Sequence, residues 1–174
     1  MNFQFGKLGM RQLAAYAVVG CLGLLGWQSA FARDLQGRLG LGYNSEFVNS
    51  VVASRVPGVS LKYALTRDIA IEAIVGSSTA SPTNSVTAVK FFKNLFLETN
   101  LNFYFTFGGG IVAANQKSGS EFLGALGAEF FIPGLESLGL AFEAGGSLHS
   151  LSGDGFSFRT LGVSFLDAGI HFYF

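Results

Sequence analysis

The sequence has very little cysteine and few charged residues, and each shortage excludes a class of structure or function. Its one cysteine, Cys21, has no partner within the chain, so no disulfide framework holds the fold. Charged residues make up 13% of the chain, against about 25% in typical globular domains. The 11 basic and 11 acidic side chains balance, and nucleic-acid binding needs a basic surface instead. We therefore expect no nucleic-acid partner.

Long apolar runs are also missing beyond the N-terminal segment, although 49% of the residues are hydrophobic. A membrane-spanning helix needs about 20 consecutive apolar residues, and no stretch after residue 32 approaches that length. No cluster of metal-ligating residues is evident, and residues 108–110 lack the strand-to-helix context of a phosphate-binding loop. We therefore expect no metal and no other cofactor. Dispersed apolar residues in so apolar a chain are typical of a transmembrane β-barrel.

The N-terminal segment has the organisation of an export signal. We predict a cleavable helical signal peptide over residues 1–32, followed by a single domain over residues 33–174. The signal consists of a basic start at Lys7 and Arg11, an apolar run over residues 13–27, and the small cleavage-site residues Ala30 and Ala32.

Two competing interpretations of this segment are a retained membrane anchor and a lipoprotein whose lipid is attached at Cys21. Arg33 and Asp34, directly after the cleavage site, favour removal over retention. The residues after Cys21 remain apolar, whereas a lipoprotein usually turns polar there. Cleavage after Ala32 would remove Cys21 and, with it, all thiol chemistry.

From Leu35 onward, apolar and polar residues alternate with a period of two, which predicts β-strands. Large residues, mostly Phe and Leu, gather on one face of each strand, whereas Gly, Ala and single charges lie on the other. A soluble sandwich would also alternate, but bulky residues suit a lipid-facing surface and small ones a narrow lumen. The eight predicted strands are residues 35–44, 57–65, 69–76, 85–93, 101–113, 121–132, 138–150 and 159–174.

The segments between the predicted strands are expected to alternate between the two ends of a barrel. Small outer-membrane barrels have short periplasmic turns and longer outer loops. Residues 94–100 make a long periplasmic connection, unless the fourth strand extends as far as Phe96. The predicted periplasmic connections are residues 66–68, 94–100 and 133–137, and the outer ones are 45–55, 77–84, 115–120 and 152–157.

The last residues form a strand that ends on an aromatic side chain. Phe174, Phe172 and Ile170 share one face, and Tyr173 and His171 share the other. This pattern resembles the C-terminal assembly signal of bacterial outer-membrane barrels. If the last strand pairs with the first, the sheet closes and no edge remains unpaired in the membrane.

Residues 99–110, 138–149 and 162–174 resemble the corresponding strands of OmpA/OmpX-like small outer-membrane β-barrel proteins. The resemblance extends over residues 33–174. It implies an all-β fold, an eight-stranded antiparallel transmembrane β-barrel, present as a monomer in the outer membrane of a Gram-negative bacterium. The expected partners are outer-membrane lipid and lipopolysaccharide, and the barrel-assembly machinery during insertion.

Charged residues on the strands are expected to point into the barrel lumen. A Lys or Arg that faces lipid at the membrane centre costs roughly 2–4 kcal/mol. We predict an ion network in which Asp167 lies beside Arg38, and Glu72 lies between Lys62 and Lys90. The predicted members are Arg38, Lys62, Glu72, Lys90, Glu129, Glu143 and Asp167, with His171 nearby.

The predicted network has two interpretations. One is an ion or proton pathway, in which Glu129 and Glu143 on adjacent strands share a proton. The other is a structural network that closes the lumen. The second is favoured because eight strands leave an interior only wide enough for side chains.

An enzyme is the main alternative to a structural barrel. Outer-membrane lipid A deacylases are also eight-stranded barrels, with a His-x-Ser motif on a late strand. Here His149 is followed two positions later by Leu151, and Ser150 and Ser152 stand at the wrong spacing. A hydroxyl nucleophile needs its base within hydrogen-bond reach, so the motif match fails and we expect no catalysis.

Two binding functions complete the alternatives. Phe47 and Val48 could contact a partner through the connection over residues 45–55, and a periplasmic β-barrel carrier would show similar strands. Loops this short disfavour a large receptor surface, and the Phe/Leu face disfavours the carrier. We therefore expect an integral outer-membrane barrel with a structural or envelope-related role, a closed lumen and no open pore.

Overall fold

The computed structural model describes residues 34–44, 58–79, 83–114, 117–152, 155–161 and 166–174. The predicted signal peptide with Ala30 and Ala32, and the loop residues Phe47 and Val48, lie outside these ranges. No helix among the described residues is long and apolar enough to span a membrane. The strands are β1 (Leu39–Asn44), β2 (Gly58–Ala64), β3 (Ile69–Ser78), β4 (Asn84–Glu98), β5 (Leu101–Ala114), β6 (Lys117–Ile132), β7 (Leu135–Leu151), β8 (Phe156–Thr160) and β9 (Leu166–Tyr173).

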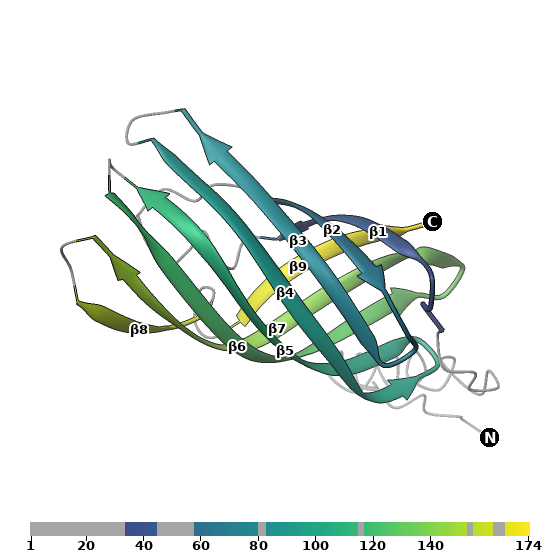
Figure 1. Cartoon of the computed structure of the whole chain (residues 1–174). Helices are drawn as coiled ribbons and strands as arrows, with labels where there is room; N and C mark the ends of the chain where they lie inside the picture. The colour runs from purple at the N-terminus through teal and green to yellow at the C-terminus, as the bar shows by residue number, and fades with distance from the viewer. Residues whose placement is uncertain (1–33, 45–57, 80–82, 115–116, 153–154, 162–165) are drawn as a thin grey trace, which may run out of the picture. The chain divides into compact units, whose positions relative to one another are not determined.

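The strands form a closed antiparallel barrel (Figure 1). Each strand from β1 to β7 pairs with the next along the chain. β9 pairs with both β7 and β1 and so closes the sheet, while β8 pairs with the remaining part of β7. β8 and β9 therefore share one position in the wall, and the predicted eight-stranded barrel is confirmed.

The eighth strand is interrupted, whereas the sequence predicted one continuous strand over residues 159–174. Thr160 lies opposite Gly146, and Leu166 lies opposite Ala144. Residues 161–165 therefore separate β8 from β9, whereas only Gly145 separates their partners on β7. At the start of the interruption, Leu161 turns into the lumen. Its side chain is 2% exposed, and its backbone N–H donates to the Gly145 carbonyl at 2.9 Å.

Other strand limits also differ from the prediction, and β6 for example begins at Lys117 rather than at residue 121. β1 begins at Leu39 rather than at residue 35, because Gly37 has a positive φ of 76° within a turn. β4 continues to Glu98, through residues that were predicted to be mostly loop. The long periplasmic connection over residues 94–100 was therefore wrong, and only Thr99 and Asn100 remain between β4 and β5.

Three short connections gather at one end of the barrel, which we call the turn end: residues 65–68, 99–100 and 133–134. We call the opposite end the loop end. The predicted assignment of connections to opposite ends is confirmed wherever the connecting residues are described.

The two faces of the strands differ as the alternation predicted, except on β8, where every residue is exposed. On β5, Phe105 and Phe107 are exposed on the outside, whereas Tyr104 and Thr106 are buried inside. Phe107 stacks on Phe91 of β4 with 5.3 Å between ring centroids, on the outer surface. The outside thus presents many large apolar side chains, and the inside is a packed core.

The core contains two apolar clusters, and on β3 and β4 the inward position between them is charged. On β3, Ala70 belongs to the cluster nearer the turn end and Ile74 to the one nearer the loop end, with Glu72 between them. The turn-side cluster is Leu35, Ala64, Ala70, Phe92, Tyr104, Phe131 and Tyr173. The loop-side cluster is Ile74, Val86, Ala88, Val112, Leu123, Ala125 and Leu161.

Candidate functional site

The charged layer between the apolar clusters is the most densely bonded polar region of the described chain. Each member occupies an inward position of its strand, so the strand alternation itself places the charge in the lumen. The inward members are between 0% and 6% exposed: Lys62, Glu72, Lys90, Glu129, Glu143, Asp167 and His171.

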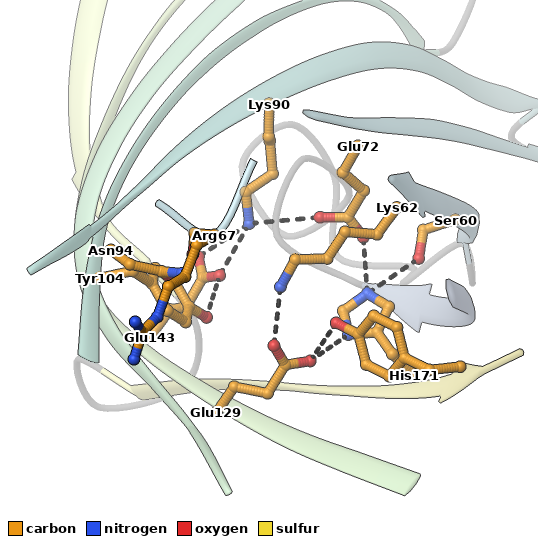
Figure 2. Close-up of polar contacts among 11 residues, drawn as sticks. Ser60, Lys62, Arg67, Glu72, Lys90, Asn94, Tyr104, Glu129, Glu143 and His171 are labelled. Atoms are coloured by element: carbon orange, nitrogen blue, oxygen red, sulfur yellow. Dashed lines mark hydrogen bonds and ion pairs between the residues drawn. The ribbon is translucent and has the colours of Figure 1, made fainter. Parts of the chain in front are cut away.

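Glu129 on β6 is the meeting point of three side chains (Figure 2). Lys62 Nζ, from β2, donates to Glu129 Oε2 at 2.9 Å. The Tyr173 hydroxyl donates to Glu129 Oε1 at 2.6 Å, and His171 Nδ1 lies 3.2 Å from the same oxygen. The strands β2, β6 and β9 are thereby joined across the lumen.

Glu72 on β3 joins His171 to the other lysine. His171 Nε2 lies 2.9 Å from Glu72 Oε1 and 3.3 Å from the Ser60 hydroxyl. Glu72 Oε2 lies 4.0 Å from Lys90 Nζ, from β4. Glu72 thus bridges the histidine and the ammonium group.

Lys90 completes the path at Glu143 on β7. Its Nζ donates to both Glu143 oxygens, at 3.0 and 2.8 Å. The Tyr104 hydroxyl donates to Glu143 Oε1 at 2.7 Å. One path therefore runs Lys62, Glu129, His171, Glu72, Lys90, Glu143, and we call these six residues the ion network.

The ion network depends on the pairing of opposite charges, because each charged side chain is almost completely removed from water. Such charges are costly to bury, and removal of one partner from a buried pair typically costs 3–5 kcal/mol, in order-of-magnitude terms. Phe92 of the turn-side cluster also lies beneath both lysines, with Lys62 Nζ 4.3 Å and Lys90 Nζ 5.0 Å from its ring centroid. A cation over an aromatic face is attracted to it.

Inward glycines provide the space that the large luminal side chains occupy. A Cβ on Gly42 would overlap the His171 ring, and one on Gly127 would lie 2.5 Å from the Tyr104 ring. A Cβ on Gly139 would lie 2.7 Å from Glu129 Oε1. The abundance of glycine on the inner face is therefore a packing requirement of the ion network.

Several predicted neighbours are confirmed by the strand register. Lys62 lies directly opposite Glu72, and Glu72 lies directly opposite Lys90. Glu129 and Glu143, which were predicted as a pair that could share a proton, accept from different lysines, Lys62 and Lys90.

The predicted contact between Asp167 and Arg38 was wrong. Asp167 lies opposite Glu143 on β7. Arg38 precedes β1, half-buried at the turn end. β9 runs antiparallel to β1 and pairs with it from Gly40 opposite Tyr173, so Arg38 lies beyond the C-terminal end of β9 while Asp167 lies toward the loop end.

His171 is the residue whose importance sequence reasoning underestimated. The alternation correctly placed it inside, opposite in direction to Ile170 and Phe172. Its partners Glu72 and Glu129 lie 99 and 42 positions away in the sequence. They lie on strands that do not border β9, so no local pattern could identify them.

His149 lies at the loop end, apart from the ion network. The register places Glu121 of β6 and Ser157 of β8 on either side of it. Ser150, the neighbour considered from the sequence, points to the opposite face of β7. Within the described ranges, no hydrogen bond joins the His149 ring to a serine hydroxyl, and no group of three or more His, Cys, Asp or Glu could hold a metal ion.

The C-terminal strand has the two faces that the sequence predicted. Phe174, Phe172 and Ile170 are exposed on the outside, and Tyr173 and His171 are buried inside. Phe174 and Leu39 exchange two backbone hydrogen bonds of 3.0 and 3.2 Å, so the last residue joins the first strand.

Comparison with known proteins identifies the fold. No family model and no curated protein sequence matches the chain. The crystal structure of the N-terminal β-barrel domain of OprF from Pseudomonas aeruginosa is similar, with a TM-score of 0.53 and 13% identity over 80% of this chain and 98% of that domain. At the level of the fold, this agrees with the resemblance to OmpA/OmpX-like barrels. The chain therefore has an eight-stranded antiparallel barrel fold like that of the OprF barrel domain.

Proposed function

We propose that the protein is an integral outer-membrane β-barrel with a structural or envelope-related role and a lumen closed by the ion network. The observation that carries the proposal is the distribution of side chains over the two faces of the barrel wall, which is the reverse of that in a soluble protein. Charged side chains are buried inside the barrel, and large apolar side chains are exposed outside it.

The outer surface is suited to lipid. Soluble monomers rarely expose contiguous apolar patches larger than a few hundred Å², whereas a membrane barrel needs an apolar band around its circumference. Exposed apolar residues occur on every strand: Leu41, Leu61, Val75, Phe91, Phe107, Phe122, Phe142, Phe158 and Phe172 are examples.

The inner layers support a closed lumen. A conducting path along the barrel axis would have to pass the turn-side cluster, the ion network and the loop-side cluster in turn. Leu161 adds to the last of these, because it packs inward from the interrupted eighth strand. A filled interior also disfavours the carrier alternative, which needs a cavity for its cargo.

The role of the protein is non-catalytic, and its partners are lipid, lipopolysaccharide and, during insertion, the barrel-assembly machinery. The deacylase alternative makes one contrary prediction. It requires His149 for changes in lipid A composition, so a His149→Ala strain with unchanged lipid A would remove its basis.

Heat-modifiability tests the proposal. Outer-membrane fractions are run on SDS gels with and without boiling, for the full chain and for a variant that lacks Phe174. A folded membrane barrel resists SDS and migrates differently until it is boiled, and loss of Phe174 should weaken this shift. A protein found in the soluble periplasm without a shift would overturn the proposal.

A further inference from the structure

His171 is placed between two carboxylates that compete for its protons. Nδ1 lies 3.2 Å from Glu129 Oε1, and Nε2 lies 2.9 Å from Glu72 Oε1. An ionised carboxylate only accepts hydrogen bonds, and a neutral imidazole has one N–H donor. Both contacts are hydrogen bonds together only if the ring carries two protons.

The neighbouring charges agree with a cationic ring. Glu129 also accepts from Lys62 at 2.9 Å, and Glu72 lies 4.0 Å from Lys90 Nζ, so each carboxylate faces a cation besides the histidine. With His171 protonated, cations and anions alternate along the whole ion network. With a neutral ring, one buried carboxylate would lack its balancing charge, which is costly in a low-dielectric interior.

The position of His171 in the chain gives this proton a structural consequence. His171 lies on β9, the strand that closes the barrel through its pairing with β7 and β1. Its ring contacts Glu72 on β3 and Glu129 on β6. The closing strand is thereby attached to two parts of the wall that its backbone does not reach.

We propose that a second proton held on His171 latches the closing strand, so that the barrel loses stability as the pH rises and this proton leaves. The proposal rests on the proposed membrane barrel and assigns its ion network a dependence on pH. The stabilisation is complete at pH values where the ring is fully protonated. It is lost as the pH rises and the ring in the folded barrel releases its second proton. The ionisable groups around the ring are Glu72 (β3), Glu129 (β6), Lys62 (β2), Tyr173 (β9), Lys90 (β4), Glu143 (β7) and Asp167 (β9).

The chain offers a matched control for this effect. It has only two histidines, and histidine is the side chain whose ordinary titration falls between about pH 5 and 8. His149 lies at the loop end and contacts neither Glu72 nor Glu129 in the described structure. A pH effect in this range that belongs to the latch must therefore survive His149→Gln and vanish in His171→Gln.

The first experiment detects the second proton on the His171 ring directly. Nitrogen-15 spectra of the full chain, folded in detergent micelles at neutral pH, distinguish a ring with two N–H groups from a neutral tautomer, and His149→Gln assigns the remaining signal. We expect His171 to show two protonated nitrogens. A His171 ring that is neutral in these spectra overturns the proposal.

The second experiment tests whether this proton stabilises the barrel. Urea midpoints of the folded barrel in lipid vesicles are measured from pH 5.5 to 9 for the wild type, His149→Gln and His171→Gln. We expect the urea midpoints of the wild type and His149→Gln to fall as the pH rises. The midpoint of His171→Gln should be about 1 M below the wild-type value at pH 5.5 and should not depend on pH. Equal slopes in all three proteins would contradict the latch.

A charge-balanced double variant separates the lost charge from lost packing. His171→Gln leaves an excess anion and Glu72→Gln an excess cation, whereas the double variant restores the balance. We expect the double variant to recover at least half of the midpoint lost by His171→Gln, and a further loss would contradict the proposal. Heat-modifiability of the wild type is measured in parallel: its absence defeats the membrane barrel itself, whereas a folded barrel with a neutral His171 defeats only the latch.

Discussion

The ion network and the loop-side cluster lie in the same lumen and meet on β3 and β4 only two positions apart, but they are stabilised differently. On β4, Lys90 belongs to the ion network, and Ala88 belongs to the loop-side cluster. The ion network depends on pairing, since a buried charge without its partner is strongly unfavourable. The loop-side cluster depends on volume and shape. The same barrel wall therefore contains a layer that is intolerant of single changes beside one that tolerates conservative substitution.

The largest predicted effect comes from breaking the ion network at Glu129. Glu129→Ala leaves Lys62 buried without its anion and removes the acceptor of the Tyr173 hydroxyl. We expect about 3–5 kcal/mol loss in the free energy of unfolding, measured by urea titration in lipid vesicles. A Glu129→Ala barrel as stable as the wild type would contradict the account of this layer.

A smaller loss is expected in the loop-side cluster. Leu161→Ala removes a side chain that is 2% exposed and should cost about 2–4 kcal/mol, whereas Leu161→Met conserves volume and should cost less than about 1.5 kcal/mol. The same urea titration compares them. Equal losses for the two variants would show that shape does not govern this cluster.

One inward glycine and one outward glycine of β6 allow a third comparison within one strand. Gly127→Ala would place a methyl group against the buried Tyr104 ring, whereas Gly124→Ala meets nothing within 4 Å. We expect Gly127→Ala to cost about 1–3 kcal/mol and Gly124→Ala to be nearly neutral. The unfolding midpoints of the two variants test this expectation. A larger loss for Gly124→Ala than for Gly127→Ala would mean that Tyr104 has room to move.

The smallest effect is expected at the turn end, where Lys93 pairs with Asp68 at 3.0 Å and both side chains are 53% exposed. Lys93→Ala should change stability by about 1 kcal/mol or less, because exposed ion pairs are screened by water and salt. The titration is repeated at high salt, where any difference should shrink. A loss comparable to that of Glu129→Ala would remove the distinction between buried and exposed pairs.

The sequence predicted the inward position of every member of the ion network, because strand alternation has a period of two. It also predicted that Glu72 lies opposite Lys62 and Lys90, since these three residues lie on consecutive strands. The contacts of Glu129 with Lys62 and His171 cross the lumen. They depend on how the closed barrel staggers its strands, which no local pattern encodes.

The interruption between β8 and β9 has a local signal that the prediction of one continuous strand overlooked. Apolar residues stand at odd positions over residues 161–165 and at even positions from Leu166 onward, so the alternation changes phase there. Leu161 itself lies inside because the barrel has space for it, and it completes the loop-side cluster. The end of β4 was misjudged because its last residues mix polar and apolar types around a register shift between Asn94 and Phe96.

The conductance of the purified, folded wild-type protein in planar lipid bilayers tests the central claim most directly, namely that side chains close the lumen. At neutral pH, where the ion network is complete, we expect insertion without stepwise currents above those of the lipid alone. Sustained single-channel currents from the folded wild-type barrel would contradict the closed lumen and restore the ion pathway as the function of the buried charges.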